Sequence, residues 1–189
     1  MILAVIPARG GSRRVHGKNI KSFHGKPIIA YSIEAAMKSG LFDRIVVSTD
    51  SDDIASVALH YGADVVKRAP WLALDEIGTR QVIFSAAQEI GAVDCVCGIY
   101  ATAPLMSVHD IVSGYSLLNE YKRHAISVGY PPLQDAAQFY WSTKTAIEED
   151  VEYFDSFTAL VKIPSERVCD INTEQDWIRA EEMYAALNN

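Results

Sequence analysis

Residues 5–19 read VIPARGGSRRVHGKN and place cations and glycines directly after an apolar run. From Arg9 to Lys26 the chain has six lysine or arginine residues and two histidines, and its first acidic residue is Glu34. Arginine presents a planar fork to phosphate oxygens, and lysine a compact charge. The two adjacent glycines allow unusual backbone angles and let main-chain N–H groups approach an anion. The loop is therefore predicted to hold a polyphosphate. The alternative is a solvated basic loop in which the glycines only make turns.

Two better-known phosphate-binding motifs are excluded by the spacing. A P-loop has four residues between its first glycine and Gly-Lys, and Ser or Thr comes next. In this chain five residues separate Gly11 from Gly17 and Lys18, and Asn19 follows. The dinucleotide pattern GxGxxG is also absent, and no helical pattern opens directly after Gly11.

Short branched apolar runs, typical of buried strands, recur along the chain. We expect strands at 1–6, 44–49, 93–100, 124–130, 137–141 and 157–163. Helical patterns with capping or stop residues lie at 26–40, 51–62, 79–91, 107–121 and 172–187. This alternation predicts an α/β fold with helices on both faces of a mostly parallel sheet. Ligands bind such sheets beyond the carboxyl ends of the strands, which indicates the loops after Ile6, Thr49 and Tyr100.

The bulk composition predicts one soluble domain, residues 1–189, in the cytoplasm. The formal net charge of −7 argues against nucleic acid as a partner. No apolar stretch approaches the roughly 20 residues of a membrane helix, and the amino terminus does not read as a signal peptide. The three cysteines, Cys95, Cys97 and Cys169, lack a metal-binding spacing and are expected to be reduced.

Several stretches together resemble one family. They are IPARGGS and KN (6–12, 18–19), GKPIIAYSIEAA (25–36), SGLFDRIVVSTDSDDIA (39–55), YGADVVKRAP (61–70), IYATAPL (99–105), AQFYW (137–141) and DINTEQDWIRAEEMY (170–184). In this order they are similar to the cytidylyltransferases that make CMP-activated acidic sugars, namely the acylneuraminate, legionaminate and pseudaminate enzymes. IYATAP and QFYW are most similar to the pseudaminic acid branch.

The resemblance implies a Rossmann-like fold of the nucleotide-diphospho-sugar transferase (glycosyltransferase-A-like) type, with three α/β/α layers. It implies a reaction in which the anomeric hydroxyl of a nine-carbon 2-keto sugar acid attacks the α-phosphorus of CTP and pyrophosphate leaves. Such chemistry depends on positioning and on charge neutralisation, which cations and Mg²⁺ supply.

Matching the family's motifs by position implies a role for each of thirteen residues. Lys18 and Arg9 would be catalytic, and both would also bind the nucleotide. The implied set is Ala8, Arg9, Gly11, Ser12, Lys18, Asn19, Arg68 and Thr79 for the nucleotide, Tyr100, Gln138 and Tyr140 for the sugar, and Asp170 and Asn172 for Mg²⁺.

The chain departs from the family in two ways. Relatives carry an acid two residues after the position of Asp170, where this chain has Asn172, and an uncharged amide holds Mg²⁺ more weakly. The segment that supplies dimer contacts in relatives is shortened near 131–137, although a homodimer stays possible. Two alternatives therefore stay open: a catalytically weak nucleotide-binding paralogue, and a nucleotidyltransferase for another sugar.

Overall fold

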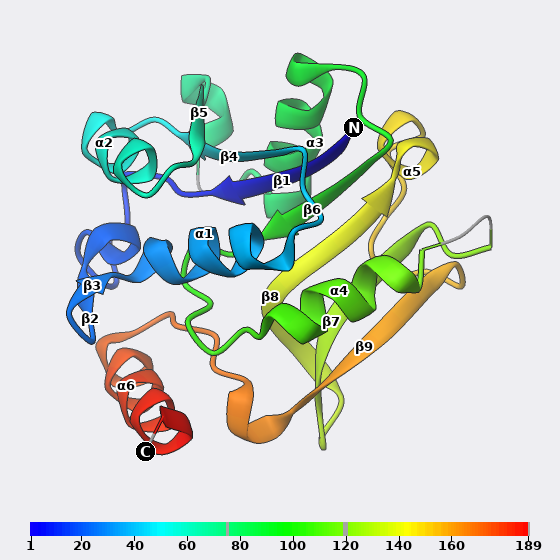
Figure 1. The fold of residues 1–189 in the computed structure, drawn as a ribbon. Coiled ribbons are helices and arrows are strands. Elements are labelled where there is room, and N and C mark those ends of the chain that lie inside the picture. Colours follow the sequence, from blue (N-terminus) through cyan, green and yellow to red (C-terminus); the bar gives the residue numbers. More distant parts are fainter. Residues whose placement is uncertain (75, 119–120, 189) are drawn as a thin grey trace.

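The computed structural model describes residues 1–74, 76–118 and 121–188. Its centre is a seven-stranded sheet with the strand order β5-β4-β1-β6-β8-β7-β9 (Figure 1). The strands are β1 (Ile2–Pro7), β4 (Arg44–Thr49), β5 (Asp64–Lys67), β6 (Cys95–Ile99), β7 (His124–Tyr130), β8 (Gln134–Thr143) and β9 (Thr158–Pro164). A separate two-stranded ribbon joins β2 (Ser22–Phe23) to β3 (Lys26–Pro27).

Only β8 runs against the other strands of this sheet. β1 pairs in parallel with β4 and β6, β4 with β5, and β7 with β9, whereas β8 is antiparallel to both β6 and β7. The carboxyl ends of six strands therefore lie at one edge, where the chain also enters β8. The predicted α/β fold with a mostly parallel sheet is confirmed.

Helices cover both faces of the sheet. The helices are α1 (Ile28–Ser39), α2 (Asp52–His60), α3 (Thr79–Ile90), α4 (Val108–Ser116), α5 (Lys144–Glu148) and α6 (Glu174–Asn188), with short 3₁₀ turns η1 (Lys18–Ile20), η2 (Pro70–Ala73) and η3 (Ser165–Arg167). Figure 1 shows α1 and α4 in front of the sheet and α3 behind it. The described residues contain no helix long and apolar enough to cross a bilayer.

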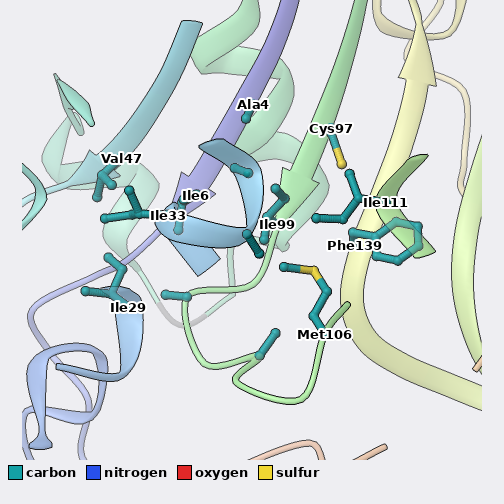
Figure 2. Packing of buried hydrophobic residues seen from close by; sticks show 14 of the residues in the cluster. Ala4, Ile6, Ile29, Ile33, Val47, Cys97, Ile99, Met106, Ile111 and Phe139 are labelled. Carbon is teal, nitrogen blue, oxygen red and sulfur yellow. The ribbon is translucent and has the colours of Figure 1, made fainter. Parts of the chain in front are cut away.

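Side chains of alternating strand residues build two cores, as the two-residue period of a strand requires. In β1, Ala4 and Ile6 face α1 and α4, and Figure 2 shows them with Ile33 of α1 and Ile111 of α4. Leu3 and Val5 of β1 belong to the core on the opposite face of the sheet, beneath α3. Both faces of the sheet are therefore covered by apolar cores. Polar site residues are expected at the edge formed by the carboxyl ends of the strands.

A third cluster lies away from the sheet and joins the two ends of the chain. Val15 and Phe23 of the amino-terminal region pack against Ile171 and against Trp177 of α6. The Nζ of Lys21 lies 4.5 Å from the centre of the Trp177 ring. Helix α6 therefore holds the segment before it against the basic loop (Figure 1).

Among the strands of the seven-stranded sheet and the α-helices, two elements were not expected from the sequence. The strand β5 has four residues with charged ends and forms one edge of the sheet, and the helix α5 has five. Both are shorter than the windows in which a periodic pattern can be recognised. The helix expected at 107–121 ends at Ser116, and residues 119–120 of that prediction lie outside the described residues.

Candidate active site

A basic pocket of about 280 Å³ opens at the carboxyl edge of the sheet. Its walls come from residues that follow β1, β5 and β6, together with the first turn of α3 and the segment before α6. Eight of the predicted site residues line it: Arg9, Ser12, Lys18, Asn19, Arg68, Thr79, Tyr100 and Asn172. Arg13 and Arg14 line it too, so five cations share one cavity. We call this cavity the basic pocket.

Buried and short-range contacts fix the shape of the basic loop. Asn19 is 7% exposed, and its Nδ2 donates to the carbonyl oxygen of Arg9 at 2.9 Å. The N–H of Gly10 donates to Asp50 Oδ1 at 2.8 Å. A Cβ atom on Gly10 would lie 2.9 Å from the Cβ of Ser51, so only glycine fits there. The loop after β4 therefore supports the basic loop.

The paired glycines do not use the left-handed backbone region that the absence of a side chain allows them. Neither Gly10 nor Gly11 has a positive φ, whereas Gly17 has a φ of 58° before η1. Gly11 is exposed, does not line the pocket, and has no heavy atom within 4 Å of a Cβ placed on it. Ala8 is buried, and its N–H donates to the carbonyl oxygen of Ser48 at 2.9 Å, which continues the β1–β4 ladder.

Lys18 bridges the two ends of the chain across the pocket. Its Nζ donates to the carbonyl oxygen of Ile171 at 2.6 Å. Burial lowers the pKa of Lys18, and the carboxylate of Asp170 partly opposes that shift. One contact leaves two N–H donors of the ammonium group for a ligand. Lys18 is thus a partly desolvated cation that faces the cavity, where a charge interacts more strongly than in water.

Arg68 also lines the basic pocket and is 6% exposed. Its Nη2 donates to the carbonyl oxygen of Ser48 at 2.8 Å. Its Nε is buried and has no hydrogen-bond partner among the described residues. Burial lowers the pKa of Arg68 to about 10, with Asp50 opposing, so the guanidinium stays charged at pH 7. A buried donor without a partner is costly, so this N–H suits a ligand acceptor.

The two predicted metal ligands, Asp170 and Asn172, are hydrogen-bonded neighbours. Their side-chain oxygens are not directed at a common point where a metal ion could bind both. Asn172 Nδ2 donates to Asp170 Oδ2 at 2.6 Å, and Asn172 Oδ1 accepts from Arg14 Nη2 at 3.0 Å. A cation beside Asp170 would therefore meet an amide N–H of Asn172. No group of three or more His, Cys, Asp or Glu side chains among the described residues could hold a metal. Asp170 alone fits as a ligand for Mg²⁺.

A second cavity, of about 440 Å³, adjoins the first. Thr79 and Tyr100 line both cavities, and their hydroxyl oxygens are 3.4 Å apart. The remaining walls are the first turn of α3, Asp135 and Tyr140 of β8, and residues 152–154. The ring of Tyr140 lies 5.6 Å from that of Tyr100 and stacks on Tyr153 at 4.8 Å. We call this cavity the aromatic pocket.

Gln138 lines neither pocket, so its position does not support the predicted contact with a sugar. It is 3% exposed, its Nε2 donates to the carbonyl oxygen of Arg167 at 2.6 Å, and its backbone carbonyl oxygen accepts from the N–H of Tyr100 at 2.9 Å. Its side chain ties β8 to η3 beneath the cavities.

The sequence did not indicate the charged residues of the aromatic pocket. Arg80 of α3 pairs with Asp150 and, at 2.7 Å, with Glu152. Asp135 accepts from the hydroxyl of Tyr140 at 2.7 and 2.8 Å. Asp135, Asp150 and Glu152 lie after residue 130, where the strands β7, β8 and β9 follow one another with only the short α5 between them, so no periodic pattern marked them. Arg80 lies in the helix predicted at 79–91, whose pattern gave it no separate role.

Comparison with known proteins places relatives of this chain among the cytidylyltransferases. The sequence profile of the family described as "Cytidylyltransferase" matches residues 3–174. The pseudaminic acid cytidylyltransferase of Campylobacter jejuni (serotype O:23/36, strain 81-176) is 33% identical over 225 positions, with 96% of this chain and 95% of that protein covered. The CMP-N,N'-diacetyllegionaminic acid synthase of Legionella pneumophila is 54% identical over 78 residues, which cover 41% of this chain and 32% of that protein.

The fold has solved counterparts as well. The structure of CMP:2-keto-3-deoxy-manno-octonic acid synthetase complexed with CTP superposes with a TM-score of 0.79 at 13% identity, covering 98% of this chain and 99% of that one. The Rossmann-like, nucleotidyltransferase type of fold is therefore confirmed, and so is the predicted family resemblance. The chain belongs to the cytidylyltransferase family of nucleotidyltransferases.

Proposed function

We propose that the protein transfers CMP from CTP to the anomeric hydroxyl of a nine-carbon acidic sugar and releases pyrophosphate. Pseudaminic acid is the first choice of acceptor, and sialic or legionaminic acid are alternatives. The observation that carries the proposal is the basic pocket, in which Lys18 reaches across to the segment before α6 while four arginines line the same cavity. The printed names of the two relatives described above, each of which includes a sugar acid, support it.

The triphosphate would lie against the basic loop. Arg9, Ser12 and Lys18 line the pocket and can donate to phosphate oxygens. Asn19 would contribute by holding the backbone of Arg9, since its Nδ2 is already engaged there. We assign charge neutralisation in the transition state to Lys18, assisted by Arg9, because the leaving pyrophosphate gains negative charge as its bond to the α-phosphorus breaks.

The cytidine would lie toward Arg68 and Thr79. The buried Nε of Arg68 has no partner among the described residues and would donate to a carbonyl oxygen of the base. Leu72 and Ile77 add apolar wall on the same side of the cavity. A flat base with a few polar edges suits a pocket with this mixture of lining residues.

Mg²⁺ would have one protein ligand, the carboxylate of Asp170. Phosphate and water oxygens would supply the remaining ligands. Mg²⁺ is commonly held by one or two carboxylates plus substrate phosphates. When bound, it would neutralise part of the triphosphate charge. Asn172 would then act through Arg14 and Asp170, which it contacts, rather than as a metal ligand.

The acceptor would enter beside Tyr100 and Tyr140. Its anomeric oxygen forms a bond to the α-phosphorus, the bond from that phosphorus to pyrophosphate breaks, and the proton of the hydroxyl is released. Thr79 and Tyr100 border both cavities, so an acceptor in the aromatic pocket adjoins a nucleotide in the basic pocket. Such proximity is the main contribution a protein makes to this type of transfer.

The test is a product assay with three acceptors. The protein is incubated with CTP, Mg²⁺ and pseudaminic, legionaminic or N-acetylneuraminic acid, and CMP-sugar and pyrophosphate are measured by mass spectrometry and a coupled assay. We expect CMP-sugar in stoichiometric amount with pyrophosphate. The absence of product with every acid would contradict the proposal, and UTP in place of CTP serves as the control.

A second candidate is a nucleotide-binding protein with weak catalysis. It is favoured by Asn172, whose amide turns an N–H toward Asp170, and by the tight connection between β7 and β8, which has only residues 131–133. The 225 aligned positions of the Campylobacter relative exceed the 189 residues of this chain, so at least 36 of them have no counterpart here. CTP binding by calorimetry without product formation would identify this case.

A further inference from the structure

The proposed reaction brings its two reacting groups to the wall between the two cavities. The bond that forms joins an oxygen of the acceptor, in the aromatic pocket, to the α-phosphorus of a nucleotide in the basic pocket. The attacking oxygen therefore lies beside Thr79 and Tyr100, which line both cavities. The remainder of the sugar, its tail, extends away from this wall into the aromatic pocket. The attacking hydroxyl must give up its proton at the wall.

One carboxylate near this wall is available to accept that proton. The described residues that line the basic pocket include no acidic side chain, and neither cavity has a histidine among its described lining residues. Asp135 and Glu152 line the aromatic pocket, but Glu152 is paired with Arg80 at 2.7 Å. Asp135 is exposed, and among the described residues it accepts only from the hydroxyl of Tyr140 and the N–H of Ala137. In protein kinases an aspartate accepts the proton of the attacking hydroxyl in the same way.

Two tyrosine hydroxyls connect Asp135 to the wall. The hydroxyl of Tyr140 donates to Asp135 Oδ1 at 2.7 Å and to Oδ2 at 2.8 Å. Its single proton is thereby used, so the oxygen of Tyr140 is left to accept a hydrogen bond. The ring of Tyr100 lies 5.6 Å from that of Tyr140, and the two hydroxyls interact, since each affects the pKa of the other. Tyr100 is therefore the donor to Tyr140, and its own oxygen can accept from the acceptor.

Burial determines how a proton can move along these hydroxyls. Tyr140 is 3% exposed, and burial raises the pKa of Tyr140 and of Tyr100 above the ordinary value for tyrosine. Neither phenol loses its proton by itself near pH 7, so each gives up one proton only as it receives another. Asp135, at the exposed end, can return the proton to water.

We propose that Tyr100 is a further catalytic residue, which takes the proton of the attacking anomeric hydroxyl and passes its own proton through Tyr140 to Asp135. As the acceptor's oxygen bonds to the α-phosphorus, its O–H bond breaks and that proton binds the oxygen of Tyr100. The proton of Tyr100 moves to Tyr140, and the proton of Tyr140 moves to the carboxylate of Asp135, which becomes neutral. Both phenols end unchanged. This role rests on the proposed function, and Tyr140 and Asp135 serve it by positioning and relaying.

The test removes each member of this chain in turn. Tyr100→Phe and Tyr140→Phe each delete one hydroxyl and keep the ring, and Asp135→Asn keeps the shape of the side chain but cannot take up the proton. Tyr130→Phe changes an exposed tyrosine at the end of β7, and Glu148→Gln an exposed carboxylate on α5; both are matched controls. Rapid quench measures the single-turnover rate of CMP-sugar formation in H₂O and D₂O. Calorimetry measures the Kd of CTP, and saturation-transfer NMR the Kd of the sugar acid.

We expect each of the three relay variants to lower the single-turnover rate by about 10²-fold, the size of a general-base contribution, with both Kd values unchanged. The double variant of Tyr140→Phe and Asp135→Asn should be no slower than either single variant, because residues that act as a unit are not additive. The wild-type rate should fall along a curve as the deuterium fraction rises, and Tyr100→Phe should lose that curvature.

A full rate in Tyr140→Phe, or a double variant slowed by the product of the single effects, overturns the inference and leaves the proposed function intact. So does a loss that comes from a raised Kd of the sugar acid with an unchanged single-turnover rate. Wild-type protein that forms no CMP-sugar with pseudaminic, legionaminic or N-acetylneuraminic acid overturns both.

Discussion

The basic pocket and the aromatic pocket share the wall made by Thr79 and Tyr100 and differ in almost everything else. One collects five cations from segments far apart in sequence, and the other carries tyrosine rings and carboxylates around a neutralised arginine. The difference suggests a division of work. Charge neutralisation belongs to one side of the wall, and recognition of an uncharged tail belongs to the other.

The largest effect should follow from Lys18→Ala. The substitution removes the ammonium group that spans the basic pocket, and we expect kcat to fall by about 10²- to 10³-fold, the size seen when a transition-state donor is lost. Lys38→Ala, which removes an exposed cation paired with Glu34 on α1, is the control. Steady-state kinetics with CTP and a sugar acid measures both. If Lys18→Ala keeps full turnover, the basic pocket is not where the charge of the reaction is neutralised.

Arg68→Ala should weaken the binding of CTP and leave the KM of the sugar acid unchanged. Loss of a hydrogen bond from a charged group costs about 1.5–3 kcal/mol, so the Kd of CTP should rise about 10- to 100-fold in calorimetry. Lys67→Ala changes the neighbouring cation, which is 81% exposed, and should leave the Kd unchanged. A rise in the KM of the sugar acid with an unchanged Kd for CTP would reverse the assignment of the two pockets.

Asn172→Asp should strengthen Mg²⁺ binding at the basic pocket. A second carboxylate beside Asp170 adds a charged oxygen ligand, so the Mg²⁺ concentration for half-maximal rate should fall several-fold. A magnesium titration of turnover measures it, and Gln175→Glu, which adds the same charge at an exposed position of α6, is the control. A requirement for more Mg²⁺ would mean that Asn172 serves the site through Arg14 alone.

The smallest effect concerns stability beneath the aromatic pocket. His124 is fully buried, its ring meets that of Tyr153 at 5.3 Å, and burial lowers its pKa. The charged groups facing it are Asp155, which opposes the shift, and Arg80. The folded state keeps His124 neutral while the unfolded chain binds a proton below about pH 6.5. Stability is therefore complete above that pH and declines as the pH falls below it.

Urea unfolding at pH 7.5 and pH 5.5 measures this slope. His124→Gln should unfold with a smaller difference between the two pH values than the wild type, and the exposed His109→Gln should match the wild type. An equal slope in all three proteins would show that other groups carry the acid sensitivity.

The parts of the molecule differ in how far the sequence predicted them. The strands at 44–49 and 124–130 were predicted with their observed bounds, because a buried strand is a branched apolar run with polar ends. The helix predicted at 172–187 begins at a reciprocal cap formed by Thr173 and Asp176, with contacts of 2.8 and 3.2 Å. β5 was missed because four residues with charged ends carry no periodic signal.

The candidate site divides in the same way. The basic loop was visible because its composition departs from the acidic average of the chain. The roles of its residues stay proposals, but most of them do share one cavity. Of the residues that line the aromatic pocket, the predicted site set contained Thr79, Tyr100 and Tyr140. Asp135 and Arg80 are positioned by contacts between β8, α3 and residues 150–152. Contacts between segments this far apart cannot be predicted from a local sequence pattern.

The most direct test of the division between the pockets is a crystal structure of the protein with CTP and a sugar acid bound. We expect the triphosphate within hydrogen-bond distance of Lys18 Nζ, the cytosine beside Arg68, and the tail of the acceptor on the far side of Thr79 and Tyr100, next to Asp135. A nucleotide bound away from Lys18, or an acceptor whose tail stays within the basic pocket, would contradict it.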